Sequence, residues 1–253
     1  MNMPNYSRPF ILAATDHGPL IFNHLDVHYL PHAAYGVGFQ LLSKGHYDAE
    51  EVKEIRSLVD DLHQQRKRDI IALDCGANIG VMTIELGKHL SSRGKVFAFE
   101  PQERLFYALC GNIALNNLFN CRVFNYALGN EDAEITCPQP DYTTRGSFGS
   151  LEMRFSTNTE FIGQSISYSH GLPVKMMTID SFVESLNLPH VDFIKLDIEG
   201  MESEALQGAI NTISNHHPAL VIEWIKVGRD PLEQFLHSHQ YQTRVLGQNI
   251  IAT

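Results

Sequence analysis

Short apolar runs alternate with amphipathic stretches along the chain after residue 70. Such runs are typical of buried strands, whereas apolar positions three or four residues apart are typical of helices. We expect five strands, over Ile70–Leu73, Lys95–Phe99, Cys121–Ala127, Val191–Ile198 and Ala219–Trp224. We expect helices ending near Leu90, over Gln102–Asn117, from Glu202 to about Ser214 and over Pro231–His239, then a closing hairpin over 242–251. This alternation predicts an α/β fold with a doubly wound, mostly parallel sheet.

The first part of the chain follows a different pattern. The apolar runs Phe10–Ala14 and Leu20–Phe22 flank a turn that contains glycine and proline, which predicts a hairpin. Residues 48–65 have the apolar spacing of an amphipathic helix. We therefore expect residues 1–66 to form a small N-terminal extension that packs on a main domain of residues 67–253.

Residues 130–173 interrupt the strand and helix rhythm. They are rich in threonine, serine, glycine and aromatic residues, with few aliphatic runs. A loop of this length is uncommon in a compact domain unless it has a function. We interpret the segment as a substrate loop, and a surface insertion without a role is the alternative.

The composition narrows the range of partners. The chain has 253 residues, 43% of them hydrophobic and 19% charged, which is ordinary for a globular protein. Its formal net charge is −10. Because phosphate contacts need clustered lysines and arginines, we expect no nucleic-acid partner. The one dense basic cluster, Arg66-Lys67-Arg68, is interpreted as a solvated helix end.

Segments for membrane insertion, export or structural metal binding are not predicted. No apolar run reaches the roughly 18–20 residues of a membrane span, and the N-terminus lacks the pattern of a signal peptide. We therefore expect a cytoplasmic protein. The four cysteines show neither CxxC pairing nor zinc spacing, so we expect free thiols, with Cys75 and Cys121 buried.

The first expected strand ends on Asp74, and the turn after it contains Gly76, Asn78 and Gly80. Glycine lets the backbone approach a ligand closely, and the N-terminus of the next helix can bind a carboxylate. The GxxxG spacing does not fit the GxGxxG fingerprint of dinucleotide sites. S-adenosylmethionine has no pyrophosphate, and its methionine end suits helix N–H groups and a nearby acid. Asp74 could instead be a helix cap.

The second expected strand ends on Glu100, followed by Pro101. In an open parallel sheet, ligands bind at the carboxyl ends of the strands, where an acid can accept hydrogen bonds from both hydroxyls of a ribose. A proline at this point stops the strand and begins the helix. Glu100 therefore predicts a ribose-bearing ligand, and a solvated glutamate beside a helix is the alternative.

The fourth expected strand carries three charged residues at alternate positions: Lys195, Asp197 and Glu199. Alternation along a strand puts them on one side of the sheet. Buried charges on a central strand are costly unless they are paired or functional. We therefore expect chemistry at Asp197 and Glu199, and an ion-paired structural role for Lys195 stays open.

Together these motifs resemble the FkbM family of S-adenosylmethionine-dependent methyltransferases. The resemblance covers about residues 70–225, and the segment around Lys195–Glu202 is its most specific part. The segments that carry it are Leu73–Gly80, Phe99–Pro101, Ala127–Gly129, Thr178–Asp180 and Ile194–Glu202, with Pro218 and Glu223. Cys75 departs from the family pattern, which more often has valine there, and we expect no effect from it.

The resemblance implies a class I, Rossmann-like methyltransferase that methylates a hydroxyl oxygen of a small molecule, sugar or glycolipid. It implies S-adenosylmethionine as cofactor, bound by Asp74, Gly76, Asn78, Gly80, Glu100, Pro101, Ala127 and Asp197. For catalysis we expect Asp197 or Glu199 as the base or orienting group, with Lys195 holding the charge pattern.

Several alternatives stay open at this point. Two neighbouring acids could hold Mg²⁺, although we favour a site without metal. A non-catalytic S-adenosylmethionine-binding or scaffolding protein would keep the same fold. A nucleotide-dependent oxidoreductase is disfavoured because the GxGxxG fingerprint fails. The sequence does not fix the oligomeric state or the acceptor.

Overall fold

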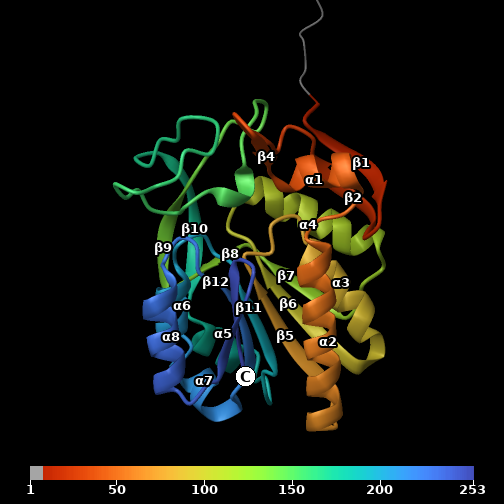
Figure 1. The fold of residues 1–253 in the computed structure, drawn as a ribbon, viewed down its shortest axis with the longest axis vertical. Helices are drawn as coiled ribbons and strands as arrows, with labels where there is room; N and C mark the ends of the chain where they lie inside the picture. The colour runs from red at the N-terminus through yellow and green to blue at the C-terminus, as the bar shows by residue number, and fades with distance from the viewer. Residues whose placement is uncertain (1–7) are drawn as a thin grey trace, which may run out of the picture.

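A seven-stranded sheet forms the centre of the molecule, in the order β13-β14-β12-β11-β5-β6-β7 (Figure 1). The computed structural model describes residues 8–253. The strands are β5 (Ile70–Cys75), β6 (Gly94–Phe99), β7 (Cys121–Phe124), β11 (Phe193–Leu196), β12 (Ala219–Glu223), β13 (Thr243–Leu246) and β14 (Asn249–Ala252). The first five pair in parallel, and the closing hairpin β13–β14 adds antiparallel to β12. The predicted doubly wound, mostly parallel sheet is confirmed.

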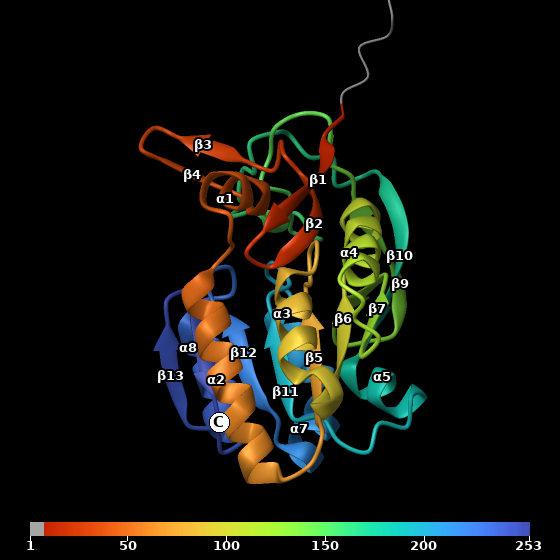
Figure 2. The same cartoon turned by 90° about the vertical axis from the view of Figure 1, so that its right-hand side faces the viewer.

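Helices cover both faces of this sheet (Figure 2). One face packs on α2 (Ala49–Arg66), α3 (Val81–Leu90) and α4 (Glu103–Leu115). The other packs on α5 (Ile179–Ser185), α6 (Glu202–Gln207), α7 (Ile210–His216) and α8 (Arg229–Ser238). Alternation along β5 produces the two cores, because Ile70 and Ala72 point to the first face and Ile71 and Leu73 to the second.

The N-terminal elements lie above the carboxyl edge of the sheet (Figure 1). They are β1 (Phe10–Thr15), β2 (Gly18–Asn23), β3 (His28–Leu30), β4 (Ala33–Tyr35) and α1 (Val37–Lys44). The predicted first hairpin and the helix over 48–65 are confirmed as β1–β2 and α2. Buried Asn112 of α4 ties the hairpin down, because its side chain bonds both the N–H and the C=O of Ile21 and the C=O of Ile79.

The third predicted strand is not continuous. The backbone leaves the central sheet after Phe124, and β8 (Tyr126–Leu128) joins a separate three-stranded sheet. Asn125 makes the break, because its side-chain amide donates to the carbonyl oxygens of Glu100 and Pro101 at 2.8 and 3.0 Å. The aromatic residues on either side, Phe124 and Tyr126, favour a strand, and the contacts of Asn125 that end it are made with residues distant in the sequence.

The predicted loop over 130–173 is partly wrong. Its two ends form β9 (Ala133–Pro138) and β10 (Gly171–Met177), which pair with each other, while β8 pairs with β10. The residues between them, 139–170, form turns, bends and irregular loop, apart from a short 3₁₀ turn at Phe148–Ser150. Another short 3₁₀ turn, Ser91–Arg93, follows α3.

The predicted helix from Glu202 to about Ser214 is divided into α6 and α7 at Gly208. A Cβ at Gly208 would lie 2.1 Å from the carbonyl oxygen of Gly129, so this backbone packs too closely for any other residue. The cysteine prediction is confirmed, because all four are free and Cys75 and Cys121 are buried. Within residues 8–253, no helix has both the length and the apolar character needed to cross a membrane.

Asn112→Ala tests how the hairpin is attached to the main sheet. We expect a loss of about 1–3 kcal/mol in the free energy of unfolding, because buried backbone groups of Ile21 and Ile79 lose their partner. Thermal unfolding measures it, with Asn158→Ala, at an exposed position, as the control. Equal melting temperatures for the two variants would contradict this role.

Candidate active site

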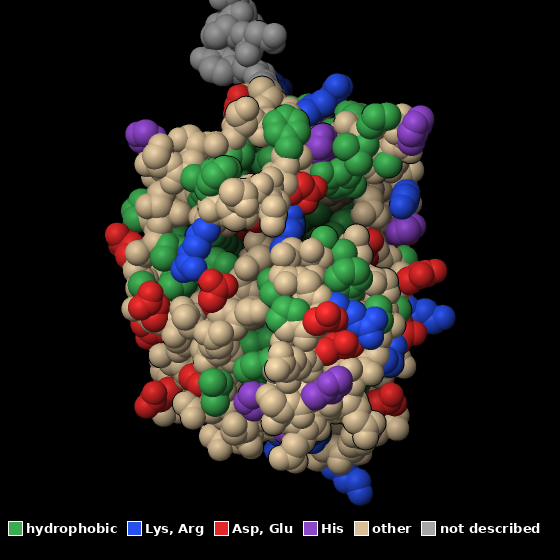
Figure 3. All heavy atoms as spheres, turned by 60° about the vertical axis from the view of Figure 1, so that its left-hand side comes forward, with side chains coloured by type: hydrophobic (Ala, Val, Ile, Leu, Met, Phe, Trp, Pro, Cys, Tyr) green, Lys and Arg blue, Asp and Glu red, His purple; other side chains and the backbone are tan. Residues whose placement is uncertain are grey.

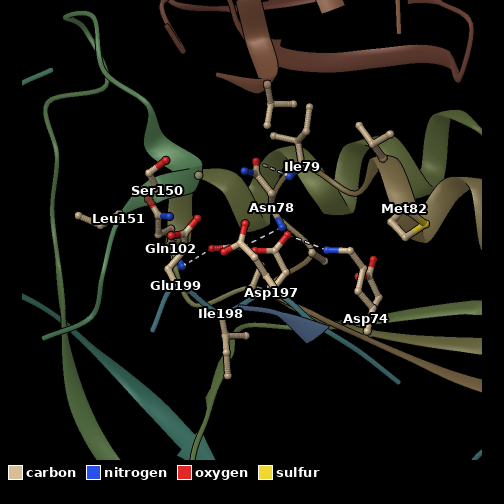
Figure 4. A pocket seen from close by; sticks show the side chains of 18 of the residues that line it. Asp74, Asn78, Ile79, Met82, Gln102, Ser150, Leu151, Asp197, Ile198 and Glu199 are labelled. Carbon is tan, nitrogen blue, oxygen red and sulfur yellow. Dashed lines mark hydrogen bonds and ion pairs between the residues drawn. The ribbon is translucent and has the colours of Figure 1, made fainter. Parts of the chain in front are cut away.

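A cavity of about 480 Å³ opens at the carboxyl ends of β5, β6, β11 and β12. Its volume suits a small molecule or cofactor. Nine of the residues predicted for the site line it: Asp74, Gly76, Asn78, Glu100, Pro101, Ala127, Lys195, Asp197 and Glu199. Figure 4 shows Asp74, Asn78, Asp197 and Glu199 around the same space. The structure thus brings together three strand ends that are far apart in the sequence.

The turn after β5 is shaped by close backbone packing. Gly76 has a φ of 83°, and a Cβ there would lie 1.7 Å from the carbonyl oxygen of Asp197. Only glycine allows this contact. Gly80, with a φ of 91°, begins α3 and does not line the cavity, so it acts on the turn and not on a ligand directly.

Asp74 lies at the base of the cavity and is buried. Its Oδ2 accepts a hydrogen bond of 2.5 Å from the hydroxyl of Thr83, one turn into α3. It is not the N-cap of that helix, because Gly80 occupies that position. Burial raises the pKa of Asp74, and the charge of Lys195 opposes this shift.

Glu100 joins two backbone segments at the cavity wall. Its two carboxylate oxygens accept hydrogen bonds of 2.8 Å from the backbone N–H groups of Asn78 and Gln102. Burial raises the pKa of Glu100 to about 7, and these two hydrogen bonds limit the rise. Each oxygen keeps a further lone pair that can accept from a ligand hydroxyl.

The fourth strand is shorter than predicted, and this changes the placement of its charges. β11 ends at Leu196, so the alternation that was expected to align Lys195, Asp197 and Glu199 stops there. Glu199 has a φ of 54° and Gly200 one of 98°, which turn the chain sharply. Asp197 and Glu199 therefore meet at the cavity through a turn and not through a strand face.

Glu202 holds this turn in place. One of its carboxylate oxygens accepts from the backbone N–H of Ile198 at 2.9 Å, and the other accepts from that of Gly200 at 3.1 Å. These bonds stabilise a left-handed conformation at Glu199 that a residue with a side chain rarely adopts. Glu202 thus stabilises the backbone conformation of Glu199.

Lys195 is 6% exposed and lies among carboxylates. Its Nζ is 2.7 Å from Oδ2 of Asp197 and 3.9 Å from Oε1 of Glu51. Burial alone would lower the pKa of Lys195, but Asp197 first, then Glu51 and Asp74, raise it above its usual range. Lys195 is therefore charged, which agrees with the ion-paired structural role left open above.

Three carboxylates meet next to this lysine. Oxygens of Asp197, Glu199 and Glu223 lie within 4.8 Å of one another, and among residues 8–253 this is the group that could hold a metal ion. Burial, followed by the charge of Asp197, raises the pKa of Glu199 well above its usual value and that of Glu223 to about 8. Like charges this close cannot all ionise easily.

Many of the other residues that line the cavity were not assigned from sequence motifs, among them Tyr35, Glu51, Glu160 and Lys226. These four come from β4, α2, the 139–170 segment and the turn after β12, so no single sequence motif contains them. Glu223 was noted only as part of the family resemblance. Its polar side chain at the end of an apolar strand was the signal that could have placed it in the site.

Glu223→Gln tests the crowding of these carboxylates. Because the pKa of Glu223 is raised from 4.5 to about 8, its contribution to stability is present at low pH and lost as pH rises between these values. The variant avoids that loss. We expect the melting temperature of the variant to match that of the parent protein near pH 5 and to be several degrees higher at pH 9. Each kcal/mol in the free energy of unfolding shifts the melting temperature by about 2–4 °C.

Melting temperatures at pH 5, 7 and 9 measure this difference. Glu131→Gln, at an exposed glutamate outside the cavity, is the control and should show no such trend. If the difference in melting temperature between Glu223→Gln and the parent protein stays constant with pH, the pKa of Glu223 is not raised.

Comparison with known proteins shows what kind of chain carries this site. Residues 74–243 match the family model of the methyltransferase FkbM domain. Methyltransferase 1 of Beauveria bassiana is 27% identical over 146 residues, which cover 55% of this chain and 58% of that protein. Hexuronic acid methyltransferase AglP of Haloferax volcanii is 26% identical over 190 residues, which cover 72% and 69%.

A solved structure has the same fold. The crystal structure of methyltransferase FkbM from Methylobacillus flagellatus superposes with a TM-score of 0.50 at 20% identity. The match covers 73% of this chain and 44% of that one. The chain thus spans little more than half of the fungal relative and less than half of the bacterial protein. Because the family model covers well over half of the sequence, this chain belongs to the FkbM methyltransferase family.

Proposed function

We propose that this protein transfers a methyl group from S-adenosylmethionine to a hydroxyl oxygen of a small molecule or glycan. The observation that carries the proposal is the meeting of Asp74, Glu100 and Asp197, each at or just after a strand end, around one cavity. Family membership supports methyl transfer, and the name of the archaeal relative supports a sugar acceptor.

The residues around Glu100 fit the cofactor. Glu100 has lone pairs free for the two ribose hydroxyls, and the acidic lining suits the positive sulfonium centre. The turn from Asp74 to Asn78 would hold the methionine end of the cofactor, and Pro101 and Ala127 would line its adenine ring. When bound, S-adenosylmethionine supplies an electrophilic methyl group, so the protein's task is to orient an acceptor oxygen and remove its proton.

We take Asp197 as the group that receives that proton. Lys195 fixes the orientation of the Asp197 carboxylate through the 2.7 Å ion pair and is therefore a positioning residue. Glu199 and Glu223 lie beside it with raised pKa values, and a base works best when its pKa is near the working pH. Proton transfer from the acceptor hydroxyl to a carboxylate oxygen of Asp197 would leave the acceptor oxygen free to attack the methyl group.

Two alternatives remain behind this proposal. A metal ion on Asp197, Glu199 and Glu223 is not favoured, because Lys195 and Lys226 already supply positive charge beside these carboxylates. A non-catalytic protein of the same fold would bind the cofactor without turnover. The paired lysine and crowded acids, which cofactor binding alone does not require, favour the enzyme.

Cofactor binding gives the first test. S-adenosylmethionine or its demethylated product should raise the melting temperature, whereas NAD should not. Glu100→Gln should weaken binding about 10–100-fold, because a hydrogen bond to a charged group contributes about 1.5–3 kcal/mol. Calorimetry measures this, with Glu131→Gln as the control. Stabilisation by NAD alone would overturn the cofactor assignment.

Asp197→Asn separates catalysis from binding. The amide keeps the shape of the side chain but cannot accept the proton, so we expect turnover to fall about 10²–10⁴-fold while the demethylated cofactor still binds. The assay follows labelled methyl transfer to a panel of hydroxylated acceptors. Undiminished turnover by the variant would show that Asp197 is not the base.

A further inference from the structure

Most of the ionisable groups that line the cavity are acids. Eight carboxyl groups and two lysines line it, and no arginine or histidine does so among residues 8–253. The carboxyl groups belong to Asp48, Glu51, Asp74, Glu100, Glu160, Asp197, Glu199 and Glu223. Any acceptor that reaches Asp197 must therefore pass and contact acidic side chains. In the space-filling view of Figure 3 the surface is hollowed near the middle of the face, with acidic and basic side chains close to the hollow.

Neither lysine is available to an anionic acceptor. Lys195 is buried and held by Asp197, as described above. Lys226 is surrounded by three carboxylates: it forms a hydrogen-bonded ion pair with Glu160, and its Nζ lies 3.5 Å from Glu152 and 3.7 Å from Glu199. A carboxylate or phosphate entering the cavity would meet acids without a free cation to compensate them.

Glu160 is itself fixed from a second side. Its Oε1 accepts a hydrogen bond of 2.5 Å from the hydroxyl of Tyr35, which lies 2.7 Å from Nδ1 of His28. The Glu160–Lys226 pair thus joins β4, the 139–170 segment and the turn after β12 at the cavity. An acceptor group would have to break this network before it could use Lys226.

Two of the carboxyl groups in the cavity have an oxygen that accepts no hydrogen bond, although each of these oxygens lies within 4 Å of a lysine Nζ. Oε1 of Glu51 and Oε2 of Glu199 are buried without a hydrogen-bond partner, and both residues line the cavity. Buried carboxylate oxygens without a donor are costly, so a ligand that supplies donors would relieve them. Hydroxyl groups supply donors and carry no charge, whereas an ionised acid supplies more acceptors.

We propose that the acceptor is an uncharged, hydroxyl-rich compound of the neutral sugar class, and that Glu160 excludes acidic acceptors by keeping Lys226 paired. This inference rests on the proposed methyl transfer to a hydroxyl group, and it separates this chain from the archaeal relative, 26% identical, whose name gives an acidic sugar. It assigns Glu160 as a specificity-determining residue, because removal of its charge would leave Lys226 free to bind an anionic group. Through this one ion pair, the 139–170 segment selects acceptors by their charge.

Two matched sugars test this: methyl β-glucoside and the corresponding methyl β-glucuronide, which differ in one carboxylate. Binding of each to the protein loaded with demethylated cofactor is measured by ligand-observed NMR titration. The glucoside should bind at least about tenfold more tightly than the glucuronide. Glu160→Gln should improve glucuronide binding about tenfold, and adding Lys226→Met should remove that gain.

Glu204→Gln is the matched control, because Glu204 pairs with Arg154 on the surface and does not line the cavity. It should leave both affinities unchanged. Equal or tighter binding of the glucuronide by the parent protein, or binding of neither sugar, would overturn the inference about the acceptor. Failure to bind the demethylated cofactor would instead contradict the proposed function.

Discussion

The buried ammonium group of Lys195 is the charge on which the arrangement of the cavity depends. It lies at the carboxyl edge of the sheet, 2.7 Å from Asp197 and within 4 Å of Glu51, and no other lysine is as deeply buried in the cavity lining. Without it, the carboxylates that end three neighbouring strands would repel one another at low dielectric. The lysine makes it possible to concentrate acids here, and the acids in turn keep it charged.

The second constraint is steric. The Gly76 turn packs directly on the backbone of Asp197, and Glu202 holds the left-handed turn at Glu199. The turn after β5 and the turn after β11 are therefore built on the same contact. A shift in one turn would move the other, so the positions of Asp74, Asn78 and Asp197 around the cavity depend on each other.

The part of the cavity beyond the sheet edge is built differently. Its walls come from the N-terminal elements and the irregular 139–170 segment, which lie above the edge of the sheet (Figure 1). Asn112 fixes the hairpin to α4, and the Glu160–Lys226 pair fixes the segment to the turn after β12. Side chains at the sheet edge and side chains outside the sheet thus line the same cavity.

The sequence by itself determined the parallel sheet, both hairpins, the amphipathic helix and the acids Asp74 and Glu100 at strand ends, because hydrophobic periodicity and polar strand ends are local signals. The family resemblance added others of the nine predicted residues that line the cavity, such as Ala127. It could not show that the third strand breaks at Asn125 or that β9 and β10 pair, since both depend on side chains and strands distant in sequence. Tertiary structure alone decided that Glu51, Glu160 and Lys226 join the site. Their charges interact through space, and no spacing along the chain records that proximity.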